Sequence, residues 1–104
     1  MASARLEALR NMVAQNPNDP FLRYGLAMEY RNGGDLEASI SEFRLLIEAN
    51  PDYAAAYQHG AQVLVHLGRT EEARSVYRAG IAVAARKGDR HARDEMQAAL
   101  DLLG

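Results

Sequence analysis

The residues able to carry metal chemistry are spread through this sequence and do not form a group. His59 and His66 lie seven residues apart in one segment, and His91 belongs to a later one. A structural or catalytic metal site needs three or four converging ligands. The chain has no cysteine and no suitably spaced carboxylate beside the first two histidines. We therefore expect surface or groove histidines, with no bound metal and no cofactor.

The acidic and hydroxyl side chains show no catalytic grouping either. The glutamates fall in different segments, and nothing marks two of them as a general acid and base pair. None of the four serines stands in a nucleophile elbow. Every glycine falls at an expected helix stop or tight-packing position, so there is no phosphate-binding loop. These patterns predict a protein that is not an enzyme.

Composition and charge narrow the classes of partner. With 104 residues and a net charge of −2, the chain is one domain without an electrostatic drive toward nucleic acid or anionic lipid. No apolar run approaches the ~18 residues of a membrane span. Residues 1–13 carry Glu7 and Arg10, unlike the core of a signal peptide. The basic residues within 86–93 are expected to be solvated, and we predict a soluble, cytoplasmic protein.

Prolines and glycines divide the sequence into six segments of helical character. Breaks occur at residues 16–20, 33–35, 50–52, 68–70 and 88–89. Asp19, Asp35 and Thr70 are placed to cap the helices that follow three of these breaks. Within each segment apolar residues recur three and four positions apart, which puts them on one helical face. The pattern predicts an all-α protein of six helices.

Residue classes recur with a period of 34. The matched pairs are Pro17 with Pro51, Ala27 with Ala61, Gly34 with Gly68, Glu37 with Glu71, Phe43 with Tyr77 and Ile47 with Ile81. Each repeat is a pair of helices too small to bury its apolar face alone. Stacking such pairs makes a continuous core.

The 34-residue unit resembles the tetratricopeptide repeat, whose pattern is W-x2-L-G-x2-Y, then A-x3-F, then P. Unit 20–53 matches at Leu26, Ala27, Tyr30, Ser39, Phe43 and Pro51. Unit 54–87 matches at Tyr57, Gly60, Ala61, Leu64, Ala73 and Tyr77. Residues 3–16 resemble the second helix of a preceding unit, and residues 89–103 resemble a capping helix. The resemblance implies a single domain, 1–104, folded as a right-handed α-α superhelix.

Two positions depart from the family pattern. Arg23 replaces the large aromatic of the first unit, so packing there is expected to shift onto Leu22 or Tyr24. Ala85 replaces the closing proline of the second unit, so that helix is expected to continue to Lys87.

The resemblance also implies a function, because this family usually holds a peptide or a partner's helix on its concave face. The lining positions carried over are Phe21, Tyr24, Met28, Arg31, Gln58, Gln62, Val65 and His66. Their aromatic, thioether and amide groups suit contact with a peptide. The alternative is that Phe21, Tyr24 and Met28 pack under the first helix. A carboxylate clamp known in some family members is not matched, since Tyr24, Met28, Gln58 and His59 hold those positions.

Self-assembly is the second functional hypothesis. A short array has two ends and an apolar groove that a second copy can cover, giving a homodimer. The half-unit 3–16, with Leu6, Leu9 and Val13 on one face, would then dock on another chain. Otherwise the expected partner is a different protein or peptide.

Overall fold

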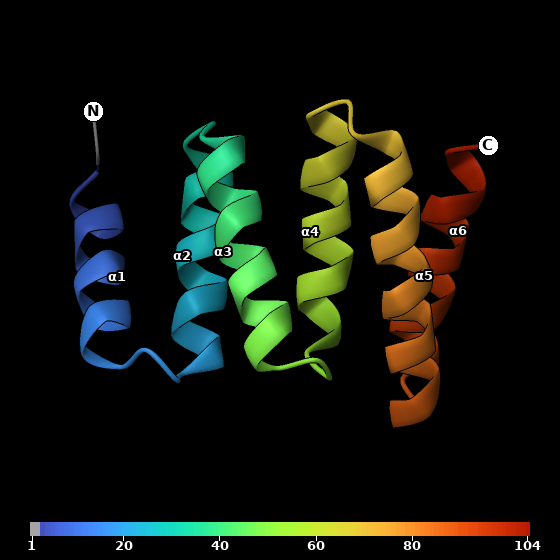
Figure 1. The fold of residues 1–104 in the computed structure, drawn as a ribbon, viewed down its shortest axis with the longest axis horizontal. Coiled ribbons are helices and arrows are strands. Elements are labelled where there is room, and N and C mark those ends of the chain that lie inside the picture. Colours follow the sequence, from blue (N-terminus) through green and yellow to red (C-terminus); the bar gives the residue numbers. More distant parts are fainter. Residues whose placement is uncertain (1–2) are drawn as a thin grey trace.

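The computed structural model describes residues 3–104, which form six α-helices joined by short turns and contain no strand (Figure 1). The helices are α1 (Ala4–Gln15), α2 (Pro20–Asn32), α3 (Leu36–Ala49), α4 (Ala54–His66), α5 (Thr70–Lys87) and α6 (Arg90–Leu102). In Figure 1 they follow one another from left to right in chain order, with α3 partly in front of α2 and α5 partly in front of α6. The prediction of an all-α protein of six helices is confirmed.

Aspartates at the breaks start the helices through their side chains. The Asp19 carboxylate accepts from the backbone N–H of Phe21 at 3.0 Å, and the Asp35 carboxylate accepts from that of Ala38 at 3.1 Å. The expected cap at Thr70 is wrong. Thr70 is already the first residue of α5, and the residue before it, Arg69, makes no side-chain cap bond. After Gly68 the chain re-enters a helix one residue earlier than its sequence signals indicate.

Two glycines in repeat register end α2 and α4 in the left-handed region of backbone space. Gly34 has a φ of 86° and Gly68 a φ of 77°, values that strain any other residue. In each turn the next N–H reaches back to a helix carbonyl at 2.9 Å, from Asp35 to Tyr30 and from Arg69 to Leu64. A side chain at either glycine would therefore strain the turn.

Helix α5 is the longest helix because no proline interrupts it. It runs past Ala85 to Lys87 and ends at Gly88, as the sequence predicted. Its last turn reaches the α3–α4 turn, where Lys87 Nζ donates to the Asp52 carbonyl at 2.8 Å and Arg86 pairs with the Asp52 carboxylate at 3.0 Å.

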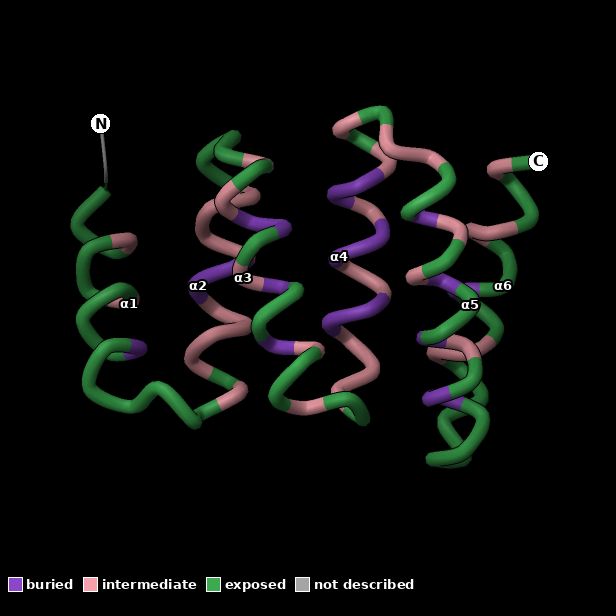
Figure 2. Tube along the Cα trace, viewed as in Figure 1, coloured by how far each residue is buried: buried purple, intermediate pink, exposed green. Residues whose placement is uncertain are grey.

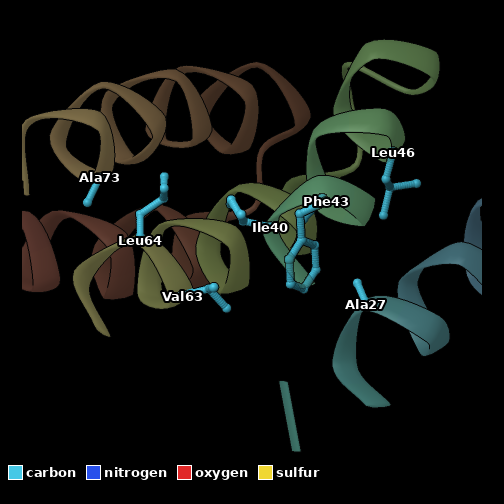
Figure 3. Close-up of a cluster of buried hydrophobic side chains, with 8 residues drawn as sticks. Ala27, Ile40, Phe43, Leu46, Val63, Leu64 and Ala73 are labelled. Carbon is cyan, nitrogen blue, oxygen red and sulfur yellow. The ribbon is translucent and has the colours of Figure 1, made fainter. Parts of the chain in front are cut away.

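The core has two parts, which meet at α4. The first lies among α2, α3, α4 and α5 and consists of Ala27, Ile40, Phe43, Leu46, Ala56, Val63, Leu64 and Ala73. The second lies among α4, α5 and α6 and consists of Tyr57, Ala61, Tyr77, Val83, Ala84 and Met96. Figure 3 shows Ile40 and Phe43 of α3 between Ala27 of α2 and Leu64 of α4. Apolar burial of this kind is the main stabilising term of the fold.

Figure 2 shows that burial is densest along α4 and sparse along α1. Val13 is the buried residue of α1, while α4 contributes six buried residues. Helix α4 is therefore central, with neighbours on both sides, and α1 is a terminal helix that packs against α2.

Small residues set the closest helix approaches. Ala27 and Ala61 are fully buried, and the buried hydroxyl of Ser39 donates to the Ala27 carbonyl at 2.8 Å across α2 and α3.

At position 23, where the sequence departs from the family pattern, Arg23 pairs with Glu42 at 2.6 Å. The Tyr24 ring packs against Phe43 with centroids 6.2 Å apart. Tyr24 is thus one of the two residues onto which packing was expected to shift.

Candidate protein-binding face

One side of the molecule is built by alternate helices, α2, α4 and α6. Side chains from these helices contact one another although they are far apart in the sequence. We define the α2–α4–α6 face by the residues Tyr24, Met28, Arg31, Gln58, His59, Gln62 and Glu95. All except the exposed Glu95 are partly buried, so they are held by neighbours and remain accessible to a partner.

Tyr24 anchors this face to the core. Its ring centroid lies 5.7 Å from that of Tyr53 and 5.7 Å from that of His59, besides the edge contact with Phe43. Burial raises the pKa of the Tyr24 phenol above its usual value, and the Arg31 charge opposes that effect. The phenol is therefore neutral at physiological pH, where its ring offers a fixed aromatic surface.

His59 connects α4 to α2. Arg31 Nη1 donates to His59 Nδ1 at 3.1 Å, so the imidazole accepts at this nitrogen. Burial, followed by the Arg31 charge, lowers the pKa of His59 below its usual value, although a hydrogen bond with the Gln62 side chain and the charge of Glu95 act in the other direction. A neutral ring at physiological pH is consistent with this bond, because only the unprotonated nitrogen can accept from the guanidinium.

Gln58 connects α4 to α6. Its Nε2 donates to Glu95 Oε2 at 2.7 Å, and Glu95 also pairs with His91 one turn earlier on α6. The C-terminal helix, expected from the sequence only to cap the array, therefore also supplies a carboxylate to this face.

The eight predicted groove residues divide into three groups. Tyr24, Arg31, Gln58 and Gln62 make or adjoin the contacts around His59 described above. Met28 and Val65 are partly buried against the core clusters. Phe21 is 71% exposed at the start of α2, and His66 is exposed at the last residue of α4.

His59 and Glu95 were not among the predicted site residues, and the reason lies in the repeat register. Position 59 matches Gly25, which has no side chain and faces Leu9 of α1. The comparison of repeats therefore gave no sign that a side chain at this position would reach Tyr24 and Arg31. For Glu95 the sequence offered one indication, the order of the helices. Because α6 follows α5 as α4 follows α3, α6 is expected on the same side of the array as α4.

Two hollows lie away from this face. One of about 590 Å³ lies between α1 and the α2–α3 turn, lined in part by Arg10, Glu29 and Tyr30. The other, about 420 Å³, lies at the α3–α4 turn beside Lys87.

No cluster of three or more potential metal ligands occurs within residues 3–104. None of the helices described in this part of the chain is long and apolar enough to cross a membrane.

Comparison with known proteins gives a consistent family likeness. The sequence model of the tetratricopeptide repeat matches residues 22–53 and 54–87. A repeat-containing protein of this type from Pseudomonas aeruginosa is 31% identical over 91 residues, covering 88% of this chain and 87% of the relative. An uncharacterized protein from Methanocaldococcus jannaschii is 42% identical over 60 residues, covering 58% of this chain and 70% of the relative.

Two solved structures share the fold. The solution structure of a tetratricopeptide repeat domain protein from Salinibacter ruber superposes with a TM-score of 0.80 at 34% identity, covering 84% of this chain and 88% of that one. The solution structure of a Bordetella parapertussis protein has a TM-score of 0.83 at 27% identity, covering 98% of this chain and 89% of that one.

Proposed function

Because this chain belongs to the tetratricopeptide repeat family, we propose that it is a non-catalytic interaction module that binds a peptide or helix of another protein on its α2–α4–α6 face. Repeats of this family generally mediate contacts between proteins. The cytoplasm is the compartment we propose for this activity, in keeping with a chain that has no cysteine.

The observation that carries the proposal is the mixed and partly exposed surface on α2, α4 and α6. Gln58 and Gln62 bring amides that can both donate to and accept from a peptide backbone. Tyr24 and Met28 provide apolar contact area beside them, and Tyr24 is already held by three rings. Aromatic and methionine side chains are enriched in protein interfaces. A face this small should give micromolar binding, roughly −8 kcal/mol.

A peptide selection followed by mapping tests the proposal. Random peptides displayed on phage are selected on the protein, and the tightest binder is synthesised and titrated into 15N-labelled protein. The amide shifts should concentrate on α2, α4 and α6. Gln62→Ala should weaken the peptide several-fold, while Gln97→Ala, at an exposed position of α6, should leave binding unchanged. Shifts confined to the other side of the helices would contradict the proposal.

Self-assembly remains the alternative function, and one feature of α1 favours it. Met12 is 46% exposed, Leu6 and Leu9 are only partly buried, and α1 packs mainly against α2. A second copy covering this helix would bury these side chains. Measuring the molar mass by light scattering over a hundredfold range of protein concentration tests self-assembly, because a constant monomer mass excludes this alternative.

A further inference from the structure

Arg31 differs from every other partly buried arginine in the structure. Five arginines within residues 3–104 are partly buried, Arg31 included, and the other four have a carboxylate within ion-pair distance. The pairs are Arg23 with Glu42, Arg69 with Glu37, Arg74 with Glu71 and Arg93 with Asp94. Arg31 pairs with no carboxylate of the described residues and instead donates to the His59 ring. The other partly buried arginines each have a carboxylate beside them, so the guanidinium of Arg31 points to an acidic ligand.

The guanidinium keeps free donors on the α2–α4–α6 face. A guanidinium has five N–H groups on three nitrogens, and the bond to His59 engages only Nη1. Nε and Nη2 of Arg31 make no hydrogen bond within residues 3–104, and no fully buried side-chain nitrogen or oxygen there lacks a partner, so neither atom is sealed from solvent. His59 holds the group in place without neutralising it, because the imidazole is uncharged when it accepts from Arg31.

Glu95 is the carboxylate of this face, and its partners keep it occupied. It accepts from Gln58 and pairs with His91, and it lies beyond ion-pair distance of Arg31. The face therefore has a positive end on α2 and a negative end on α6, joined by the amides of α4.

We propose that Arg31 binds the carboxylate of an aspartate or glutamate side chain within the segment that occupies this face. The inference rests on the proposed function and adds to it the chemistry of the ligand. An acidic side chain inside a continuing segment fits better than a terminal carboxylate, because the amides of Gln58 and Gln62 can hydrogen-bond a backbone that continues past Arg31.

The test uses the same phage selection on three proteins, the parent, Arg31→Gln and Arg78→Gln. Arg78 is the matched control because it is exposed, is on α5 and makes no ion pair in the described structure. Peptides selected on the parent and on Arg78→Gln should contain aspartate or glutamate at one recurring position. That preference should disappear from peptides selected on Arg31→Gln, which circular dichroism must show to be folded.

A change on the peptide tests the same contact without altering the protein. In an acetylated and amidated binder, replacing the recurring glutamate by glutamine should weaken binding to the parent roughly 10- to 100-fold, the range for a hydrogen bond to a charged group. The same replacement should have little effect on binding to Arg31→Gln. Arg31→Lys should recover part of the preference, because it keeps the charge and loses the planar fork.

Two results would overturn the inference and leave the proposed function standing. Peptides that map to the α2–α4–α6 face without any acidic preference would show that Arg31 recognises no carboxylate. A preference for a free C-terminus, with none for internal acidic residues, would show that the bound carboxylate is the end of the ligand and not a side chain. Failure of peptides to map to this face at all would instead refute the proposed function.

Discussion

Replacing Gly80 by alanine should destabilise the protein, although alanine is the better helix former. Gly80 lies in α5, where α5 packs against both α4 and α6. A Cβ at this position would lie 2.6 Å from Met96 Sδ and 2.6 Å from Tyr57 Cβ. Carbon atoms in favourable contact are about 3.5–4.0 Å apart, so both contacts are too short. The Met96 thioether can rotate away, but Tyr57 Cβ moves only with the backbone of α4.

The expected loss follows from two opposing terms. Overpacking of a well-packed core costs about 1–3 kcal/mol, and two simultaneous clashes place this site in the upper half of that range. Alanine recovers up to about 1 kcal/mol through its helix propensity. The net prediction is a loss of roughly 1–2 kcal/mol of unfolding free energy, measured by urea denaturation followed by circular dichroism.

Gly25→Ala is the matched control because its sign should be opposite. A Cβ at position 25 would meet only the end of the flexible Leu9 side chain, at 3.4 Å. The helix-propensity gain should therefore dominate, and this variant should be more stable than the parent by up to about 1 kcal/mol. If Gly80→Ala is as stable as the parent while Gly25→Ala behaves as expected, α4, α5 and α6 do not approach as closely as described here.

Three further variants test the core and the α2–α4–α6 face. Ala61→Leu, at a fully buried position, should lose about 1–3 kcal/mol by overpacking in the same urea assay, and a parent-like midpoint would disprove the tight packing at Ala61. Ser39→Ala should cost about 0.5–1.5 kcal/mol through the lost bond to the Ala27 carbonyl, while the exposed control Ser41→Ala should cost less. The lowered pKa of His59 means that the unfolded chain takes up its proton first as pH falls. This residue therefore reduces stability below about pH 6.5, with the loss growing until pH reaches the folded-state pKa. Urea midpoints at about pH 7.5 and pH 5.5 should fall further for the parent than for His59→Gln, and equal losses would show that His59 is not responsible.

The helices could be predicted from the sequence because their limits depend on neighbouring residues. Glycine with positive φ ends α2 and α4, and aspartate carboxylates accept the first free N–H groups of α2 and α3. The repeat period also placed Ala27 and Ala61 at equivalent positions, and both are fully buried. The error at Thr70 was one residue at a helix start, where local signals are least decisive.

The face was less predictable because its contacts join residues that are distant along the chain. Arg31 and His59 are 28 residues apart, and Gln58 and Glu95 are 37 apart. The family resemblance supplied Tyr24 and Arg31 as lining positions of α2. It contained no information on which groups of α4 and α6 would be brought against them.

The amino-acid sequence alone determined six helices, their turns and the stacking of equivalent pairs, because capping, glycine conformation and apolar periodicity act within a few residues. Only the tertiary structure decided that His59 would contact Arg31 and Tyr24, and that Glu95 would extend the face onto α6. Those contacts depend on how far each helix rotates when its apolar side packs against its neighbours. Packing of the whole array sets that rotation, and it therefore decides that the partly buried Arg31 contacts His59 and no carboxylate.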